Sequence, residues 1–529
     1  MGSKKLQVWL PSIFALVMIL GMYLGFNLRG NTAGAGIFLR NSNSTPVQEI
    51  MDLVKTRYVD NIKPDSLSGL VIDNVLTHLD PHSIYIPPKD VQYVNEDLEG
   101  SFQGIGVEFQ VFDDTVNILS VIKNGPSDKA GMQVGDKLIK VNDTALLAGV
   151  HITGDGIRKY LRGPASSSVT LTVLRDKQLK RMVIERGTIP LPSRDAYYLI
   201  APQTGYIRLN KFSETTYPEF MEAMDKLQKQ GMQKLILDLR DNGGGIVDQA
   251  TNIADEFLDE DKMIVYTDGK NAPHQDYRCR KEGVFEKGKL VVLVNEGTAS
   301  ASEILSGALQ DWDRATIIGR RTFGKGLVQQ QFNLSNGGAL RLTIARYYTP
   351  LGRNIQKPYD KGRDAYEDEL MNRFHDGEVI HGDTAKRSGP AFKTPAGRIV
   401  YGGGGITPDV FVPFDTTTQS RAISQMYMKG TMSNFVYNYY MTHKAALQAL
   451  KTPGELYNQF KPGEAEWQQL LDFARKDSID VSTISANAKA DILQRIPPML
   501  ARQIWRTEGY FEVSNQTDST IKKALEVLK

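Results

Sequence analysis

Four short apolar runs in the middle of the chain predict the core strands of a layered α/β domain. The runs are Tyr206–Leu209, Lys234–Leu239, Lys289–Val294 and Ala315–Ile318. Segments with helical spacing lie between them, for example from about Asp248 to Leu258, and this alternation is typical of a sheet covered by helices. After Asn336-Gly337, apolar and polar residues alternate through Leu340–Ile344, which predicts a hairpin.

Helices are predicted on both sides of this region. Val47–Tyr58 and Ser68–His78 have helical apolar spacing and, with Asp80–Leu98, form a helical lead-in. After about Asp415 we expect several more helices, among them Asn434–Leu450, Ala465–Arg475 and Ser519–Leu528. Met and aromatic residues between positions 426 and 440 are more often core than binding surface. No motif indicates whether residues 415–529 dock on the body, mediate oligomerisation or hold a partner.

The first residues predict export. Lys4 and Lys5 precede Val8–Leu28, an almost uncharged stretch that is long enough, at ~20 residues, to span a bilayer. The two lysines predict a cytoplasmic N-terminus and an extracytoplasmic body, so we expect a single-pass inner-membrane anchor with the body in the periplasm. The alternative is a cleaved signal peptide, because Ala33-Gly34-Ala35 offers small residues for cleavage. Residues 31–46, rich in Gly, Asn, Ser and Thr, read as a linker.

Composition narrows the classes of function. A chain of 529 residues is long enough for two or three domains, and a net charge of +2 gives no electrostatic case for nucleic acid. The sequence has no His-Glu-x-x-His and no pair of cysteines with zinc spacing, so we expect no metal and no other cofactor. Cys279 is the single cysteine, which permits no intramolecular disulfide.

Ser300 and Lys325 are the residues that best indicate chemistry. Ser300 lies in Gly297–Glu303 and Lys325 in Thr322–Gly326, and each segment follows a predicted core strand. A serine hydroxyl needs a base to take its proton, and an amine can serve if its pKa falls. Lysine starts near ~10.4 and a useful base sits near ~7–8, a change that burial can supply. The pair therefore predicts a serine hydrolase without a catalytic histidine.

Each residue also has a structural interpretation. Ser300-x-x-Glu303 fits a helix capping box, which is compatible with catalysis because helix N-termini present free N–H groups. Gly319-x-x-x-x-Gly324-Lys325-Gly326 nearly matches a phosphate-binding loop. That motif needs Ser or Thr after the lysine and then a helix, whereas Gly326 stands there and Leu327–Phe332 reads as a strand. We therefore exclude the phosphate loop.

A glycine run offers a third element. Arg240–Gly245 lies between a predicted strand and a predicted helix, and consecutive glycines allow backbone N–H groups to point into one concavity. Such a nest suits the oxyanion of a tetrahedral intermediate. The alternative is a tight turn that only requires positive φ. By contrast, Asp80-Pro81-His82-Ser83 is typical of a turn, and we do not expect it to act as an acid/base pair.

These motifs together resemble the carboxy-terminal processing peptidases, the tail-specific family of serine proteases. The matching segments run in the family's order from about residue 45 to 415: Leu79–Tyr85, Gly104–Val107, Leu239–Gly245, Thr298–Ile304, Thr322–Gln329, Ala345–Gln356 and Gly402–Val410. The resemblance implies a layered α/β catalytic core with a ClpP/crotonase-like sheet, in which Ser300 is the nucleophile and Lys325 the general base. It further implies that Gln329 orients the lysine amine.

The resemblance also implies the oxyanion donors. They are the backbone N–H of Ala301 and that of a glycine in Gly243–Gly245, with Gly244 the expected one. The family often has proline where Gly243 stands, which leaves this register open by one residue.

Residues from about Gly100 to Arg186 resemble a PDZ domain. Val107, Phe109 and Val111 alternate with polar residues, and Ile157–Leu161 begins the helix beside the expected peptide groove. Such domains add a chain end as an extra strand and hold its carboxylate in a backbone nest. The candidate nest is Gly104-Ile105-Gly106-Val107, with a generic glycine turn as the alternative. We expect the partners to be proteins with free, apolar C-terminal tails.

The predicted organisation has six parts. They are an anchor or signal segment (1–30), a linker (31–46), a helical lead-in (47–99), a PDZ domain (100–187), a catalytic domain (188–414) and a mainly helical extension (415–529). The predicted function is that of an exported, membrane-anchored serine endopeptidase that processes or degrades proteins from their C-termini. A binding scaffold with a silent peptidase site is the alternative. An oligomer or an adaptor remains open.

Overall fold

The computed structural model describes residues 14–23, 45–62, 64–112, 114–149, 152–259, 261–382, 389–415, 420–482 and 484–529. The chain divides into two compact units, Met1–Ile72 and Asp73–Lys529. In the first unit, residues 14–23 are helical, as are α2 (Pro46–Arg57) and the start of α3 (Pro64–Thr77). No helix in these described ranges has the length and apolar character needed to cross a membrane. Much of the predicted span Val8–Leu28, and nearly all of the linker, lies outside them.

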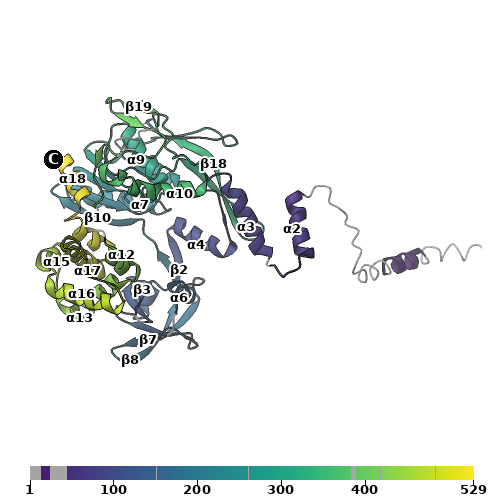
Figure 1. Ribbon diagram of the computed structural model, residues 1–529, viewed down its shortest axis with the longest axis horizontal. Helices are drawn as coiled ribbons and strands as arrows, with labels where there is room; N and C mark the ends of the chain where they lie inside the picture. Colours follow the sequence, from purple (N-terminus) through teal and green to yellow (C-terminus); the bar gives the residue numbers. More distant parts are fainter. Residues whose placement is uncertain are drawn as a thin grey trace, which may run out of the picture. The chain divides into compact units, whose positions relative to one another are not determined.

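A six-stranded sheet lies in the part of the second unit that carries α7 (Thr216–Lys229), α9 (Ala301–Asp311) and β10 (Arg194–Ala201) in Figure 1. Its strands, in spatial order, are β10 (Arg194–Ala201), β11 (Thr204–Leu209), β12 (Lys234–Asp238), β15 (Lys289–Val294), β16 (Thr316–Gly319) and β21 (Val410–Phe411). Neighbouring strands run parallel except for β10 and β11. The predicted core strands therefore form one layered α/β sheet, as expected.

Helices cover both faces of this sheet, which explains why its strands read as continuous apolar runs. On β12, Leu235 and Leu237 point into one core, against α7 (Thr216–Lys229), α8 (Val247–Asp255) and α9 (Ala301–Asp311). Ile236 points the opposite way and packs in a second core with α18 (Ser519–Leu528). The last described helix of the chain is thus part of the catalytic core.

A second sheet is antiparallel in all its described pairings. It contains β1 (Ile84–Ile86), β18 (Ala339–Tyr348), β13 (Met263–Asp268), β14 (Gln275–Arg278) and β17 (Leu327–Asn333). β17 and β18 form the predicted hairpin, with Gly337 at φ 81° in its turn. The register of this hairpin shifts between Val328 and Gln329, and such bulges often re-aim a side chain near a functional site.

The PDZ region has the predicted order of elements. β2 (Ser101–Gly104) pairs with β9 (Gly187–Pro190), which connects the domain to the catalytic body. The domain's own sheet runs β3 (Val107–Phe112), β4 (Thr115–Val121), β5 (Lys137–Val141), β7 (Ser168–Arg175) and β8 (Gln178–Glu185), with α5 (Pro126–Lys129) and α6 (Gly154–Leu161). β3 stands at one end of this sheet and, among the described strands, pairs with β4 alone, so an outer edge of this kind can accept another strand.

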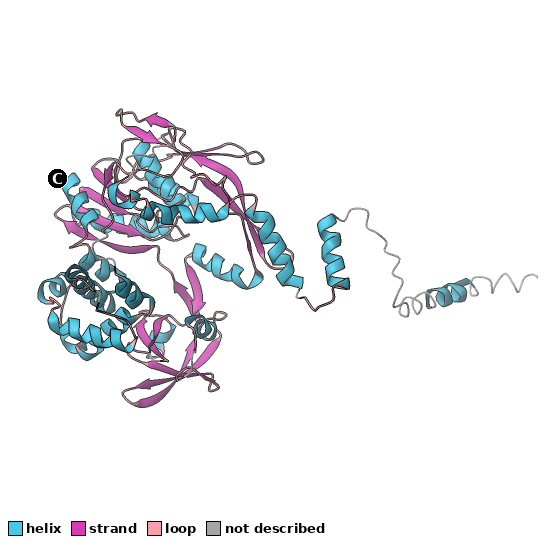
Figure 2. Ribbon diagram, in the orientation of Figure 1, coloured by secondary structure: helices cyan, strands magenta, loops and turns pink. Residues whose placement is uncertain are grey.

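The C-terminal residues form a helical domain (Figure 2). Its helices are α12 (Arg421–Met428), α13 (Thr431–Thr442), α14 (Lys444–Gln448), α15 (Pro453–Gln459), α16 (Glu464–Lys476) and α17 (Ala486–Ser514). The predicted helix Asn434–Leu450 is divided between α13 and α14. Most of the Met and aromatic residues are buried in this domain's core as expected, whereas Met428 is 86 % exposed.

Candidate active site

Ser300 occupies the turn between β15 and α9, at the N-cap of the helix. Its backbone has φ 57° and ψ −118°, a conformation that residues with a side chain rarely adopt. Backbone strain of this kind costs of order 1–3 kcal/mol and is typical of functional sites. The predicted capping box is present, with Glu303 accepting from the Ser300 N–H. The turn therefore presents the Ser300 hydroxyl at the start of the helix in a strained backbone conformation.

Lys325 lies in the loop between β16 and β17. Its Nζ donates a hydrogen bond to Gln329 Oε1 at 2.8 Å, and the Gln329 amide donates in turn to the carbonyl oxygen of His82. Gln329 directly follows the register shift in β17. A strand, not a helix, follows the loop, which bears out the exclusion of a phosphate-binding loop.

The buried carboxylate of Glu303 connects the serine turn to the lysine loop. Its Oε2 accepts from the N–H groups of Ser300 (2.8 Å) and Lys325 (2.9 Å). Its Oε1 accepts from Gly324 N–H (2.8 Å) and the Thr322 hydroxyl (2.5 Å). Burial raises the pKa of Glu303, and these four donors oppose the rise. Glu303, which was predicted to cap the helix, thus holds the segment of Ser300 and the segment of Lys325 together.

Tyr347 on β18 makes a second bridge between the same two residues. Its hydroxyl lies 3.2 Å from the carbonyl oxygen of Ser300 and 2.5 Å from that of Lys325. The backbones of the two residues are therefore joined at their N–H groups through Glu303 and at their carbonyls through Tyr347. No direct hydrogen bond between Lys325 Nζ and Ser300 Oγ occurs among the hydrogen bonds of the described residues, in which Nζ is directed to Gln329.

The surroundings of Lys325 favour the neutral amine. Burial, helped by the positive charge of Arg341, lowers the pKa of Lys325 to about 8, although Glu303 and Asp80 oppose the change. Burial, then the charge of Lys325, lowers the pKa of His82 to about 4. The His82 ring is held by the Tyr366 hydroxyl, 2.7 Å from Nε2. His82 is therefore neutral near pH 7 and adds no positive charge beside the lysine.

The segment that contains His82 has a role that the sequence analysis did not assign. Asp80 Oδ1 accepts from the N–H groups of His82 (2.8 Å) and Ser83 (2.9 Å), so the segment is the turn that was predicted. The Thr343 hydroxyl also donates to Asp80, at 3.0 Å, which fixes the turn to β18. The turn places the His82 carbonyl where it accepts from Gln329. The distinctive Leu79–Tyr85 motif was the signal in the sequence from which a role for this turn could have been predicted.

The oxyanion candidates lie next to the serine. A Cβ added to Gly244 would stand 2.8 Å from Ser300 Cβ and 2.9 Å from Ala301 N, so only glycine permits this approach. Ala301 N–H has no acceptor within the described part of the chain. Gly244 N–H, however, donates to Asn242 Oδ1 at 2.9 Å, while the N–H groups of Gly243 and Gly245 have no acceptor among the described residues.

A buried charged cluster fixes the start of the glycine run, and the sequence analysis missed it. Asp238, at the end of β12, is fully buried and accepts from Arg240 Nη2 (2.7 Å) and the Tyr206 hydroxyl (2.8 Å). Burial alone would raise the pKa of Asp238, but Arg240 and Arg208 outweigh it and hold that pKa far below its usual range. Arg240 also pairs with Asp518, the N-cap of α18, at 2.7 Å.

The candidate carboxylate nest joins β2 to β3. Gly104 ends β2, Val107 begins β3, and Gly106 between them has φ 74°. The carbonyls of Ile105 and Gly106 accept from Ser127 and Ile122, while their own N–H groups have no acceptor among the described residues. All four residues line one large cavity. Free N–H groups facing a cavity suit a terminal carboxylate.

Within the described ranges, no group of three or more His, Cys, Asp or Glu side chains is arranged to hold a metal ion. Cys279 is buried, and burial raises the pKa of its thiol to about 12, so the thiol is protonated and unreactive near neutral pH.

Comparison with known proteins identifies the family. The model of peptidase family S41 matches residues 203–361, that of the PDZ domain matches residues 118–175, and that of a family of unknown function (DUF8443) matches residues 422–506. A carboxy-terminal-processing protease of Bartonella bacilliformis is 35% identical over 318 residues, which cover 58% of this chain and 71% of that protein.

Two further relatives are similar to this chain. A probable CtpA-like serine protease of Staphylococcus aureus is 34% identical over 320 residues, 59% of this chain and 63% of that protein. The solved photosystem II D1 C-terminal processing protease shares 26% identity with a TM-score of 0.36, covering 72% of this chain and 88% of that one. With a PDZ domain, an S41 peptidase domain and the extent of the Bartonella match, the chain belongs to the carboxy-terminal processing proteases, which are serine-type peptidases.

Proposed function

We propose that the peptidase works through a Ser300–Lys325 dyad. The observation that carries the proposal is the double bridge of Glu303 and Tyr347, which holds a strained serine turn against the loop of a lysine whose pKa burial lowers to about 8. A neutral amine has two N–H bonds and one lone pair. Because Gln329 accepts one N–H, the lone pair remains free for the serine proton.

The reaction then follows acyl transfer. Ser300 Oγ attacks the scissile carbonyl while Lys325 Nζ takes its proton, and the resulting ammonium protonates the leaving amine. Water, deprotonated by the same amine, hydrolyses the acyl-enzyme. Ala301 N–H is the first oxyanion donor, and Gly244 N–H becomes the second when it leaves Asn242 Oδ1. Losing one such donor typically costs about 2.7–4 kcal/mol of transition-state stabilisation.

We further propose that the PDZ domain selects substrates by their C-terminal tails. The tail adds to the free edge of β3, and its carboxylate binds the N–H groups of the Gly104–Val107 loop. Small apolar side chains at the end of the tail fit between β3 and α6. The free edge of β3 and the unoccupied N–H groups of Ile105 and Gly106 support this reading.

Cleavage assays test the dyad directly. We expect the purified wild type to cleave an unstructured polypeptide with an apolar tail, and Ser300→Ala and Lys325→Arg to lose roughly 10⁴- to 10⁶-fold in kcat. Arginine keeps the positive charge but does not release its proton at working pH. Turnover is followed by mass spectrometry of the products, with Arg181→Lys on an exposed PDZ strand as the unaffected control. Full turnover by Lys325→Arg would show that Lys325 is not the base.

The pH dependence follows from the same lysine. The active form is the neutral amine, so kcat/KM should rise to a plateau above about pH 8 and fall about tenfold per unit below it, since the pKa of Lys325 is lowered to about 8. Arg341 contributes to this lowering, so Arg341→Gln should move the midpoint to higher pH, whereas Arg181→Gln should not. An unchanged midpoint in Arg341→Gln contradicts this electrostatic account.

The strain at Ser300 makes a prediction about stability. Glycine adopts φ 57° without a side-chain clash, so Ser300→Gly should be more stable than Ser300→Ala by about 1 kcal/mol, although both are inactive. Within helix α9 the order should reverse, with Ser306→Gly less stable than Ser306→Ala by about 1 kcal/mol. Urea unfolding of the four variants measures both differences. The same order at both positions would mean that Ser300 is not strained.

We also propose that Val8–Leu28 anchors the enzyme in the inner membrane with its body in the periplasm. Lys4, Lys5 and the uncharged stretch that follows them support this topology. Full-length protein should stay with the membrane after carbonate extraction, and its body should be digested by protease added outside the inner membrane. A soluble protein that begins near residue 36 would instead establish the cleaved signal peptide.

A further inference from the structure

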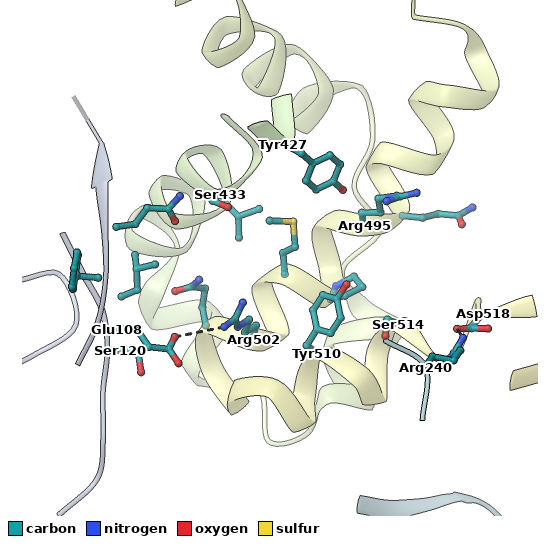
Figure 3. A pocket seen from close by; sticks show the side chains of 18 of the residues that line it. Glu108, Ser120, Arg240, Tyr427, Ser433, Arg495, Arg502, Tyr510, Ser514 and Asp518 are labelled. Atoms are coloured by element: carbon teal, nitrogen blue, oxygen red, sulfur yellow. Dashed lines mark hydrogen bonds and ion pairs between the residues drawn. The ribbon is translucent and has the colours of Figure 1, made fainter. Parts of the chain in front are cut away.

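A large cavity joins the PDZ groove to the helical domain. Its volume is about 1060 Å³, and the free edge of β3, the nest loop and α6 line one side of it. Residues of α12, α13 and above all α17 line the opposite side. Figure 3 shows this arrangement, with Glu108 and Ser120 at the PDZ strands and Arg502 and Tyr510 on the helical side.

The two domains are held together around this cavity by several contacts. The rings of Phe112 and Tyr437 lie 5.6 Å apart, and Arg506 Nη2 donates to the carbonyl of Val121 at 2.7 Å. Val134 of the PDZ domain packs into the helical core. In this structure these contacts hold α17 in place as the wall of the cavity that faces the PDZ groove.

The two faces of β3 have different neighbours. Val107, Phe109 and Val111 pack on the PDZ core, so Glu108 and Gln110 point to the other face. Glu108 lies 3.8 Å from Arg502 of α17, and the Gln110 amide approaches Gly430 just before α13. Residues opposite one another in paired strands point to the same side. A tail paired with β3 would therefore direct every second side chain toward α17.

Four polar groups lie on that side, and three of them, Arg502, Ser120 and Gln503, are available to a ligand. Arg502 and Glu108 are each 55 % exposed and only 3.8 Å apart, a spacing typical of a weak pair. Other arginines of the cavity hold closer partners, such as Arg162 with Glu96 at 2.8 Å and Arg495 with Asp491 at 2.7 Å. Ser120 Oγ and Gln503 Oε1 are buried at the cavity and have no hydrogen-bond partner in the described part of the chain.

We propose that the helical domain forms the second wall of the tail-binding site, and that Arg502 selects tails with an acidic side chain on the face turned toward α17. The carboxylate of such a tail takes the place of Glu108 beside Arg502, while the serine hydroxyl of Ser120 and the amide of Gln503 bind the polar groups next to it. This inference rests on the proposed tail recognition and assigns a role in substrate choice to a domain that matches a family of unknown function.

Peptide binding to the full-length Ser300→Ala protein tests the proposal without cleavage of the probe. The probes are fluorescein-labelled decapeptides that end in a single Ala with a free carboxylate and carry Glu, Gln or Lys at both the second and the fourth position from the end. Fluorescence anisotropy gives the Kd. We expect the Glu peptide to bind about fivefold tighter than the Gln peptide. Arg502→Gln should abolish the difference, and Arg502→Glu should favour the Lys peptide.

Arg475→Glu is the matched control, because Arg475 is an exposed arginine of the same domain that does not line the cavity. It should leave the preference unchanged. The proposal is overturned if the Arg502 variants keep the wild-type preference, or if they weaken all three peptides equally. C-terminally amidated peptides separate the two levels of inference: if they bind as well as free acids, the proposed tail recognition itself is wrong. Circular dichroism confirms that each variant is folded.

Discussion

The geometry of the active site depends on one buried carboxylate. Glu303 is fully buried, and both of its carboxylate oxygens accept hydrogen bonds, from the serine turn, the lysine loop and the Thr322 hydroxyl. A buried polar group is costly unless it is fully hydrogen-bonded, so each of these donors is needed to keep the carboxylate in place. Because the carboxylate must keep these hydrogen bonds, the turn that follows β15 and the loop that follows β16 remain in contact.

The candidate active site and the candidate tail-binding site are built from different parts of the molecule. The parallel sheet and its helices fix Ser300 and the glycine run, whereas the hairpin of the second sheet supplies Gln329 and Tyr347. The PDZ edge strand and the helical domain border a cavity that also reaches Arg240, Arg320 and Asp518 of the catalytic body. The bridges between Ser300 and Lys325 are made by Glu303 and Tyr347, neither of which lines this cavity.

Much of this architecture could be predicted from the sequence because local patterns determine it. Apolar runs such as Lys289–Val294 become strands buried on both faces, and Asn336-Gly337 becomes the hairpin turn. The proximity of Ser300 and Lys325 could be expected, since both follow parallel strands that end at the same edge of the sheet. Glu303 was recognised only as a capping residue, because its contacts with Gly324 and Lys325 join segments that are distant in the chain.

Other features depend on contacts that no local pattern encodes. Asp238, Arg240 and Asp518 form one charged cluster although the last of them lies in a region without a recognised motif. The hydrogen bond of Gly244 N–H to Asn242 Oδ1 depends on a side-chain rotamer. The cavity beside β3 exists because two separately predicted regions pack together, and its residues belong to both.

The position of α18 has a consequence for biosynthesis. Ile521, Ala524 and Leu528 complete the second core beneath β12, β15 and β16, and Asp518 neutralises Arg240 beside the glycine run. During translation these residues emerge long after Ser300 and Lys325. Until they arrive, part of one apolar face of the central sheet stays exposed to water, and Arg240 has Asp238 but not Asp518 as a counter-ion. The core of the catalytic domain is therefore completed only after the helical domain that precedes α18 in the sequence has been synthesised.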